Sequence, residues 1–316
     1  MLSMKGVFFI VGPTASGKSE LAADVAQKIG AEVVSADAFQ IYRGLDLLSA
    51  KPDAETLAKA PHHLIGTVSL SEEMNAEKFR QLAIQTLNEI SSREKPAIVA
   101  GGSGLYIKAL THGLASVPKR DSKIRAELDR MSLDELYAKL RELDPETAHE
   151  IDSHNRRRLI RAVEICVTIG KPASTQRTQW AVAASLRDAL ASHSEAATGV
   201  FVFRERDELY ERINRRVETM FEGGVIEEVR ATDATSATAT QMIGLREIRQ
   251  LLAGHMSISQ SIAAIQQATR RYAKRQLTWF RRQTNFFPLN LSLLSHKEAV
   301  TRISQLSKAF EGCVRE

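Results

Sequence analysis

Short, continuous apolar runs alternate with segments of helical spacing over the first hundred residues. Three runs have the length and the β-branched or aromatic content of buried strands: 7–11, 31–35 and 96–100. Between them, 20–26 and 76–91 place apolar side chains at helical spacing. Such alternation, with strands that are apolar throughout, predicts a parallel sheet that helices cover on both faces.

The pattern changes to helices without a clear strand between about residues 111 and 197. The helices expected there cover 122–131, 132–143, 145–151 and 156–169. We interpret residues 112–199 as an α-helical insertion into a core formed by 1–111 and 200–316.

The chain after the insertion is expected to return to the sheet with a strand at 201–203. Helices then follow up to residue 282, interrupted by a polar loop at 232–240. We expect the tail after Phe286 to be a surface helix without evident chemistry.

A complete GxxxxGKS phosphate loop follows the first strand and precedes a helix, which is the context that the motif requires. Its glycines let backbone N–H groups turn toward an anion, and the helix N-terminus adds partial positive charge. Lys18 would reach the phosphates and the Ser19 hydroxyl would hold Mg²⁺. The diphosphate-binding residues predicted by this motif are Gly12, Pro13, Thr14, Ala15, Ser16, Gly17, Lys18 and Ser19. The expected fold class is therefore α/β, a P-loop NTPase-like core with a parallel sheet flanked by helices, plus the α-helical insertion.

Composition narrows the class of protein without naming its partner. The 316 residues contain 43% hydrophobic and 26% charged residues, typical of a globular protein, and a net charge of only +5. Cys166 and Cys313 form no metal-binding spacing, so we expect free thiols in a reducing compartment. Because no stretch approaches the roughly 20 apolar residues of a membrane span, we expect a soluble, cytoplasmic protein without a membrane partner.

Asp37 stands just after the second strand and allows three interpretations. It can be a general base at the mouth of the sheet, a carboxylate that orders Mg²⁺, or the N-cap of a helix. A second glycine turn, Gly101-Gly102-Ser103-Gly104, ends the third strand. Because ligands of parallel sheets bind beyond the carboxyl ends of the strands, these two segments and the phosphate loop are expected to share one cleft.

Two basic segments contain no acidic residue. On a helical projection, the six basic residues of 269–282 fall within an arc of about 140°, opposite Tyr272, Ala273, Trp279 and Phe280. A second cluster, Arg156-Arg157-Arg158 with Arg161, lies in the insertion. A solvated helix face is one explanation. Two such patches in a nearly balanced protein instead favour a polyanion larger than a nucleotide.

Taken together, these motifs resemble one family, the tRNA dimethylallyltransferases, also called tRNA isopentenyltransferases. The resemblance extends over residues 7–282 in the family's order. The matching segments are GPTASGKS (12–19), DAFQIYRGLD (37–46), AKP (50–52), PHHL (61–64), GGSGLYIKAL (101–110), NRRRLIRAVEI (155–165), DELYERINRRVETM (207–220), QMIGLREI (241–248) and TRRYAKRQLTWFRR (269–282).

The resemblance implies transfer of a dimethylallyl group from dimethylallyl diphosphate to the exocyclic amine of the adenosine next to the 3′ end of a tRNA anticodon. The family's general base aligns with Asp37, and the hydroxyl that orients the amine aligns with Ser103. Lys18, the loop and Mg²⁺ at Ser19 would stabilise the leaving pyrophosphate. We expect a monomer. The RNA contacts implied by the resemblance are Asp37, Ala38, Phe39, Gln40, Ser103, Arg125, Arg157, Arg158, Arg161, Gln241, Gly244, Arg246, Arg270, Arg271, Lys274 and Arg275.

Three alternatives share parts of this pattern. An adenylate isopentenyltransferase acting on free AMP, ADP or ATP would use the same cleft chemistry without needing the insertion or the basic helix. An ATP-binding kinase would use the loop and Asp37, yet no segment resembles an arginine-bearing lid specific to kinases. A catalytically silent RNA-binding module would not need Lys18, Ser19, Asp37 and Ser103 together.

Overall fold

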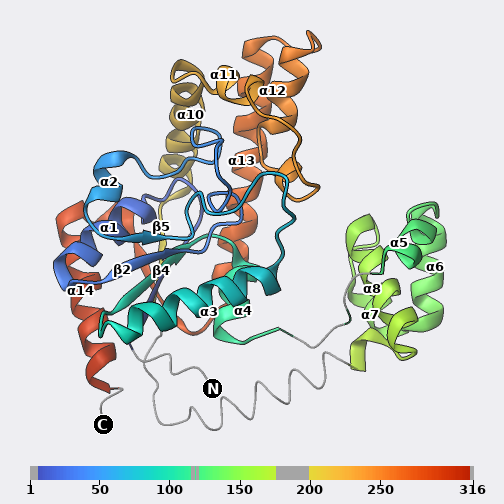
Figure 1. Cartoon of the computed structure of the whole chain (residues 1–316), viewed down its shortest axis with the longest axis horizontal. Coiled ribbons are helices and arrows are strands. Elements are labelled where there is room, and N and C mark those ends of the chain that lie inside the picture. The colour runs from blue at the N-terminus through green and yellow to red at the C-terminus, as the bar shows by residue number, and fades with distance from the viewer. Residues whose placement is uncertain (1–5, 115–117, 119–120, 176–198, 314–316) are drawn as a thin grey trace. The chain divides into compact units, whose positions relative to one another are not determined.

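The computed structural model describes residues 6–114, 118, 121–175 and 199–313 (Figure 1). The chain divides into two compact units, one formed by residues 1–111 and 194–316, the other by 112–193. The first unit carries the sheet and the second is helical. The insertion's predicted C-terminal edge at residue 199 adjoins residues 176–198, which lie outside the described residues.

One six-stranded sheet organises the first unit, and every pair of neighbouring strands is parallel. Its order is β3-β2-β4-β1-β5-β6, with β1 aligned to β4 so that Val7 pairs with Ala97. The strands are β1 Val7–Val11, β2 Glu32–Ser35, β3 His62–His63, β4 Ala97–Gly101, β5 Gly199–Phe203 and β6 Phe286–Asn290. The predicted α/β class with a helix-flanked parallel sheet is confirmed.

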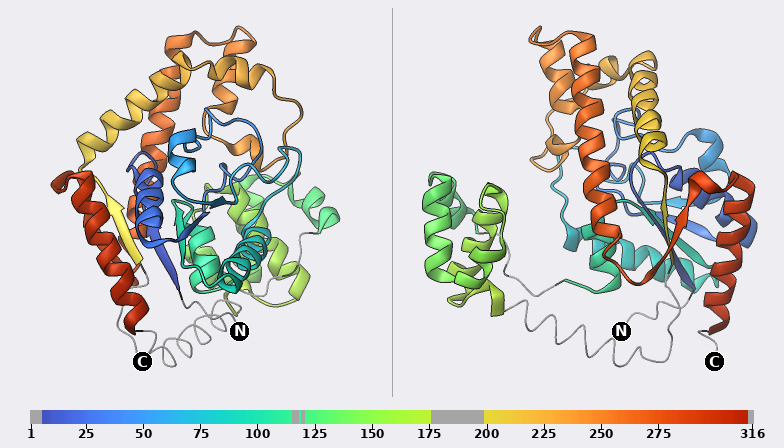
Figure 2. Two further views of the ribbon diagram at one scale, coloured as in Figure 1. Left: turned by 60° about the vertical axis from the view of Figure 1, so that its left-hand side comes forward. Right: turned by 180° about the vertical axis from the view of Figure 1, so that it is seen from behind.

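Helices cover both faces of this sheet (Figures 1 and 2). Successive side chains of a strand point to opposite faces, so Phe8 and Ile10 of β1 join one buried cluster while Phe9 and Val11 join the other. The first cluster packs against α1 (Lys18–Ile29) and α14 (His296–Cys313), and the second against α3 (Ala76–Ser92) and α4 (Gly104–Thr111). A short helix, α2 (Ala54–Ala58), lies beside α1.

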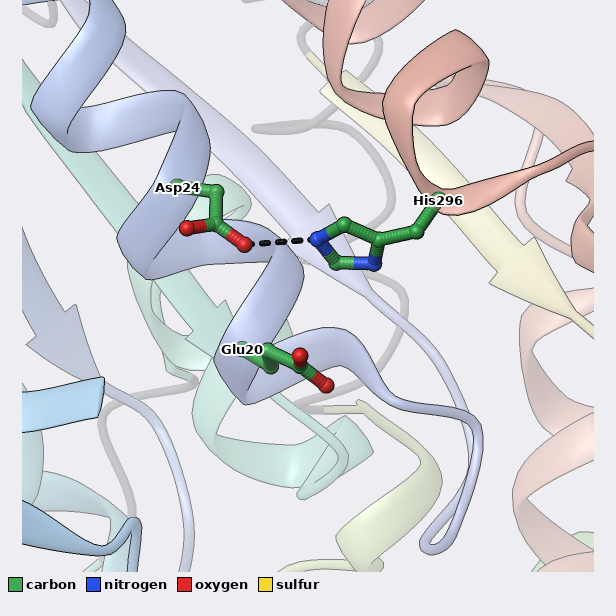
Figure 3. Close-up of side chains that lie close together, drawn as sticks. All are labelled: Glu20, Asp24 and His296. Carbon is green, nitrogen blue, oxygen red and sulfur yellow. Dashed lines mark hydrogen bonds and ion pairs between the residues drawn. The ribbon is translucent and has the colours of Figure 1, made fainter. Parts of the chain in front are cut away.

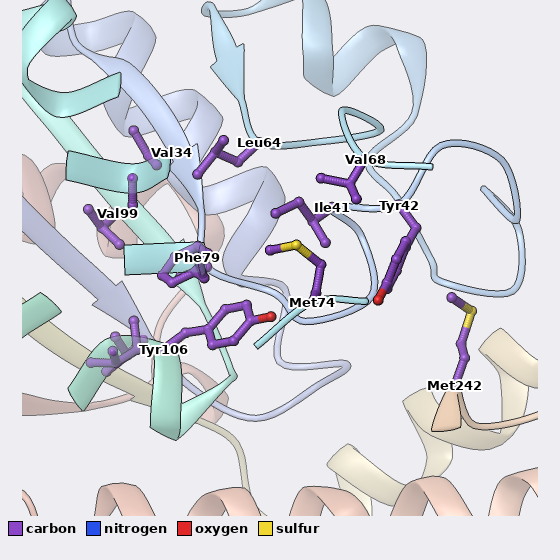
Figure 4. Close-up of a cluster of buried hydrophobic side chains, with 14 of the residues drawn as sticks. Val34, Ile41, Tyr42, Leu64, Val68, Met74, Phe79, Val99, Tyr106 and Met242 are labelled. Carbon is purple, nitrogen blue, oxygen red and sulfur yellow. The ribbon is translucent and has the colours of Figure 1, made fainter. Parts of the chain in front are cut away.

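The larger cluster extends from the sheet to the loops that carry the predicted site (Figure 4). Phe79 of α3 stacks on Tyr106 of α4 with ring centroids 4.0 Å apart, which joins these two helices. Ile41 and Tyr42 are fully buried in the same cluster. Burial of these two side chains anchors the segment that follows Asp37.

The segment after Phe286 differs from its prediction as a surface helix. It begins with β6, which extends the sheet beyond β5, and only then forms α14. Pro288 is compatible with this strand because β6 lies at an edge, where a missing N–H is tolerated. Ala299 and Ile303 of α14 are buried against the sheet, so the tail belongs to the core.

Helices α10, α11 and α12, which follow β5, lie beyond the carboxyl ends of the strands (Figure 1). Helix α13 packs along α10, and α12 packs against both α11 and α13. These elements are α10 Arg206–Glu222, α11 Val225–Arg230, a short 3-10 turn η1 Ala239–Gln241, α12 Leu245–Leu252 and α13 Ile258–Phe280.

Four helices form the described part of the second unit, each at the place expected from its spacing. They are α5 Ser122–Leu128, α6 Leu133–Leu143, α7 Pro145–Glu150 and α8 Arg156–Ile169. A capping box of Ser132 and Glu135 starts α6, and Asp144 caps α7 through the Thr147 N–H. Cys166 is a buried free thiol in its core, whereas the side chain of Cys313 lies outside the described residues. Among the described residues, no helix has the length and apolarity needed to cross a membrane.

Candidate active site

The phosphate loop connects β1 to α1 with two residues in left-handed backbone conformation, Ala15 at φ 64° and Gly17 at φ 92°. Gly12 lies so close to β5 that a Cβ there would be 2.2 Å from the Val202 carbonyl oxygen. The Lys18 ammonium donates to the Pro13 carbonyl oxygen over 3.2 Å and so folds back across the loop. This is the local geometry that cradles an anion at a helix N-terminus.

Three arginines donate hydrogen bonds to the loop. Arg204 Nε donates to the Ser16 carbonyl and Arg212 Nε to the Ala15 carbonyl, each over 2.9 Å. Arg216 Nη1 donates to Thr14 Oγ1 over 3.3 Å. The carbonyl and the N–H of one peptide unit point in opposite directions. Because the carbonyls of Ala15 and Ser16 face the arginines, the N–H groups of the same peptide units face away from them.

These arginines were not among the predicted site residues. Arg212 and Arg216 lie four residues apart on α10, so they share one helix face. That spacing within the matching segment 207–220 was the available signal. Arg204 follows the end of β5, the strand whose return to the sheet the sequence did predict.

A cleft of about 350 Å³ opens in front of the loop. Its basic side chains outnumber its acidic ones, which suits an anionic ligand. The charged lining residues are Lys18, Lys51, Lys59, Arg212, Arg216, Glu20, Asp37, Asp53 and Glu55. Ser19, the predicted metal ligand, lines the same cleft.

Two cations of this cleft have lowered pKa values, which an anion bound next to them would raise again. Burial lowers the pKa of Lys18 to about 8, against the attraction of Asp37 and with some help from Arg216. Burial and the neighbouring Arg212 likewise lower the pKa of Arg216. Lys18 and Arg216 are half-buried, and cations partly shielded from water gain more from a bound anion than exposed cations do.

The lowered pKa of Lys18 predicts a pH-dependent affinity for pyrophosphate. A bound anion raises the pKa of Lys18, so binding takes up a proton wherever the free protein has lost it. Affinity is therefore greatest below pH 8 and falls above it, by up to about tenfold per pH unit.

Calorimetry of pyrophosphate binding between pH 6.5 and 9.5 in a chelating buffer measures this dependence. Lys18→Met serves as the control, because the titration of pyrophosphate itself is common to both proteins. The ratio of the two affinities should decrease above pH 8. A ratio that does not change with pH would contradict the assignment.

Asp37 caps the turn that it opens and also faces the cleft. Its Oδ1 accepts from the N–H of Phe39 over 2.9 Å and from that of Gln40 over 3.3 Å. Asp37 therefore caps a turn, whereas the sequence suggested the N-cap of a helix. These bonds use one carboxylate oxygen. Because Asp37 also lines the cleft of the phosphate loop, capping and catalysis are compatible.

Ser103 lies next to Asp37, as expected for two strand ends of one parallel sheet. Its Oγ accepts from the N–H of Ala38 over 2.9 Å. Close approach requires the flanking glycines: a Cβ on Gly101 would be 2.3 Å from the Ala36 carbonyl oxygen, and one on Gly104 would be 2.7 Å from the Trp279 ring. The phosphate loop, Asp37 and Ser103 therefore lie close together at the carboxyl ends of neighbouring strands.

A smaller pocket of about 70 Å³ opens beside Asp37 and Thr14. Most of its lining is apolar, with Tyr272, Thr269 and Arg216 as further polar members. The apolar residues are Phe39, Leu48, Ala50, Val217, Met220, Met242, Ile243 and Ile265. The pocket suits a short hydrocarbon held between a phosphate loop and a carboxylate.

Helix α13 presents the predicted basic stripe. Arg271, Lys274 and Arg275 are exposed on it, while Ala273 and Phe280 are buried. Arg270 departs from the stripe: it is half-buried, with its guanidinium 5.8 Å from the centre of the Tyr210 ring.

The other predicted RNA contacts of this unit lie on neighbouring elements. Gly244 starts α12 with φ 98°, and the exposed Gln241 and Arg246 flank it. Gln40 donates to the Ala50 carbonyl over 2.9 Å.

The arginines of the insertion have two environments. Arg157 and Arg158 are exposed on α8. Arg125 and Arg161 instead pair with the fully buried Glu164, over 3.3 and 2.7 Å. Glu164 thus holds the guanidinium groups of two residues that were predicted to contact RNA.

A cluster of possible metal ligands lies between α1 and α14, formed by Glu20, Asp24 and His296 (Figure 3). Asp24 already has two partners, His296 Nε2 at 2.6 Å and the Lys59 ammonium at 2.8 Å. A cation would have to compete with that ammonium. The cluster therefore serves to join α1 to α14 and α2.

Comparisons with known proteins identify the family of this chain. The model of the IPP transferase family matches residues 40–283. The chain is 42% identical to tRNA dimethylallyltransferase 1 of Citrifermentans bemidjiense, covering 89% of this chain and 90% of that one. It is 41% identical to the tRNA dimethylallyltransferase of Geobacter sulfurreducens, covering 90% and 93%.

A solved structure matches nearly the whole length of the chain. The full-length tRNA isopentenylpyrophosphate transferase of Bacillus halodurans superimposes with a TM-score of 0.69 at 32% identity, covering 98% of this chain and 99% of that one. Family model, sequence relatives and structure each span most of the chain. The chain therefore belongs to the IPP transferase family, the tRNA dimethylallyltransferases.

Proposed function

We propose that this protein transfers a dimethylallyl group from dimethylallyl diphosphate to N6 of the adenosine 3′-adjacent to the anticodon of a tRNA, giving N6-isopentenyladenosine. The observation that carries the proposal is the apolar pocket between the phosphate loop and Asp37. It provides room for a short hydrocarbon whose diphosphate lies in the basic cleft and whose acceptor amine lies near a carboxylate. The names of the relatives support the same reaction.

The reaction joins N6 to C1 of the dimethylallyl group. The N6 lone pair forms the new bond, the C1–O bond breaks, and its electron pair leaves with pyrophosphate. Adenine's amine is a weak nucleophile because its lone pair is delocalised into the ring. Asp37 accepts the N6 proton as general base, and the Ser103 hydroxyl orients the amine.

Stabilisation of the leaving pyrophosphate falls to Lys18, Arg216 and the N–H groups of the loop. The cleft also suits a hard cation such as Mg²⁺, because the Ser19 hydroxyl and the carboxylates of Asp53 and Glu55 line it with oxygen ligands. Ser19 would hold the ion, which would supply further positive charge to the pyrophosphate.

For tRNA recognition, we propose that residues 1–111 and 200–316 form the catalytic core and that 112–199 form a domain contacting the anticodon stem-loop. The exposed Arg157 and Arg158 would bind RNA phosphates there. The target adenosine must leave its stack to reach Asp37, at a cost of a few kcal/mol. We place the enzyme in the cytoplasm as a monomer.

The basic stripe on α13 should account for part of the salt dependence of tRNA binding. Replacing Arg271, Lys274 and Arg275 together with alanine removes three exposed cations. Each lost phosphate contact reduces the slope of log affinity against log salt by about 0.7–0.9, so a decrease of roughly 2–3 is expected.

Filter binding of unmodified tRNA between 50 and 300 mM KCl measures that slope. Lys297→Ala, which removes an exposed cation of α14, is the matched control and should leave the slope unchanged. If the triple variant has the wild-type slope, the stripe is only a solvated face.

Labelled dimethylallyl diphosphate with a divalent cation tests the reaction. Unmodified tRNA is offered in one tube, and AMP with ATP in another. Transfer to tRNA alone supports the proposal, whereas transfer to the mononucleotides would show an adenylate isopentenyltransferase. Binding of tRNA without any transfer would indicate a silent module.

A further inference from the structure

Gln276 of α13 bridges the two loops that the proposed reaction needs. Its Oε1 accepts from the N–H of Thr14 in the phosphate loop over 2.9 Å. Its Nε2 donates to the carbonyl of Gly102, in the turn that carries Ser103, over 2.8 Å. One partner is a donor and the other an acceptor, so the bonds fix which way the amide points.

The bridge is buried and tightly packed. The side chain is only 5% exposed. A Cβ on Gly102 would lie 2.3 Å from Nε2, so glycine at this position allows the amide to approach the turn. Buried amide bonds are costly to leave unmade, which makes the separation of the two loops well defined.

Each end of the bridge leads directly to a group of the proposed site. Thr14 lines both the diphosphate cleft and the apolar pocket, and Arg216 donates to its hydroxyl. Gly102 immediately precedes Ser103, which accepts from the N–H after Asp37. One loop holds the leaving group, and the other positions the acceptor amine.

We propose that Gln276 is a positioning residue that sets the distance between the leaving pyrophosphate and the acceptor amine. The inference rests on the proposed function. In the proposed reaction Gln276 contacts neither substrate, so it acts through Thr14 and Gly102. Misplacement of reacting groups by about 1 Å can cost about 10²-fold in rate, so losing the bridge should affect kcat far more than substrate binding.

Three variants test the bridge. Gln276→Met keeps the volume and removes both hydrogen bonds. Gln276→Glu keeps an acceptor for the Thr14 N–H but places a carboxylate oxygen against the Gly102 carbonyl. Gln283→Met is the matched control, because the side-chain amide of Gln283 donates to the Trp279 carbonyl at the end of the same helix and bridges no loops.

Steady-state kinetics and hydrogen exchange of segments 12–19 and 101–104 give independent readouts. Gln276→Met should lower kcat by about 10²-fold, change the KM for each substrate by less than about threefold, and speed exchange in both segments. Gln276→Glu should lower kcat similarly while speeding exchange only in 101–104. Gln283→Met should match the wild type in both measurements.

The proposal is overturned if Gln276→Met keeps kcat within about threefold of the wild type. It is also overturned if Gln276→Glu has wild-type kcat while exchange in 101–104 is faster, because the link to Gly102 would then be both broken and dispensable. Thermal unfolding of each variant separates these effects from loss of the fold. If the proposed function itself is wrong, the wild-type protein would transfer no prenyl group, which distinguishes that failure from the two variant results. Hydrogen exchange would still show whether the bridge holds the two loops.

Discussion

Replacing Asp37 with asparagine is expected to lower kcat by roughly 10²–10⁴-fold, the usual contribution of a general base. The amide cannot accept the N6 proton. Its oxygen can still accept from the N–H groups of Phe39 and Gln40, so the turn that Asp37 caps should remain. The loss therefore belongs to the chemical step and not to folding.

Two measurements separate these effects. Binding of unmodified tRNA and of pyrophosphate to Asp37→Asn should stay close to wild type, while single-turnover transfer slows. Asp121→Asn is the matched change for capping alone, because Asp121 Oδ1 likewise accepts from two backbone N–H groups, those of Lys123 and Ile124, at the start of α5. Retention of near wild-type transfer by Asp37→Asn would show that Asp37 is only a cap and that another group takes the proton.

The sequence was most informative where local chemistry decides the structure. The strand-loop-helix at 7–26 depends on adjacent residues, and the structure places β1, the loop and α1 there. The neighbouring positions of Asp37 and Ser103 followed from a general property of parallel sheets, whose strand ends meet at one edge. Here a correct element prediction was enough to bring distant residues together.

Long-range partners were not accessible in the same way. The strand Phe286–Asn290 contains a proline and has no strong alternation, and it exists because β5 offers an edge to pair with. Gln276 gave no signal as an uncharged residue within a basic segment. Its role appears only when Thr14 and Gly102 are seen on either side of it. Whether Asp37 is a cap or a base is likewise decided by its surroundings and not by its residue type.

The basic cleft also explains how a phosphate loop can serve alkyl transfer. In such a loop the anion is usually the group transferred, but here the proposed reaction leaves it behind. Lys18 and Arg216 are half-buried cations with lowered pKa values, so a counter-charge would stabilise them. Charge that grows on pyrophosphate during C–O cleavage supplies it, so the same groups stabilise the transition state more than the bound substrate.

Substitution of Lys18 by methionine is the second large effect that we expect. The change keeps the length of the side chain and removes the ammonium that lies across the loop near the Pro13 carbonyl. Loss of one preorganised group that stabilises developing negative charge costs about 10²–10³-fold in kcat. Because the charge is greater on the leaving pyrophosphate than on the intact diphosphate ester, kcat should fall more than the affinity for dimethylallyl diphosphate.

Single-turnover transfer at saturating dimethylallyl diphosphate measures that loss, with Lys95→Met as an exposed control away from the cleft. Lys18→Arg should not restore the rate, since a planar guanidinium cannot replace a compact ammonium folded back within the loop. The result that would contradict this role is a Lys18→Met enzyme with wild-type kcat and a raised KM alone. In that case Lys18 would bind ground state and transition state equally, and stabilisation of the leaving group would rest on Arg216 and the loop N–H groups.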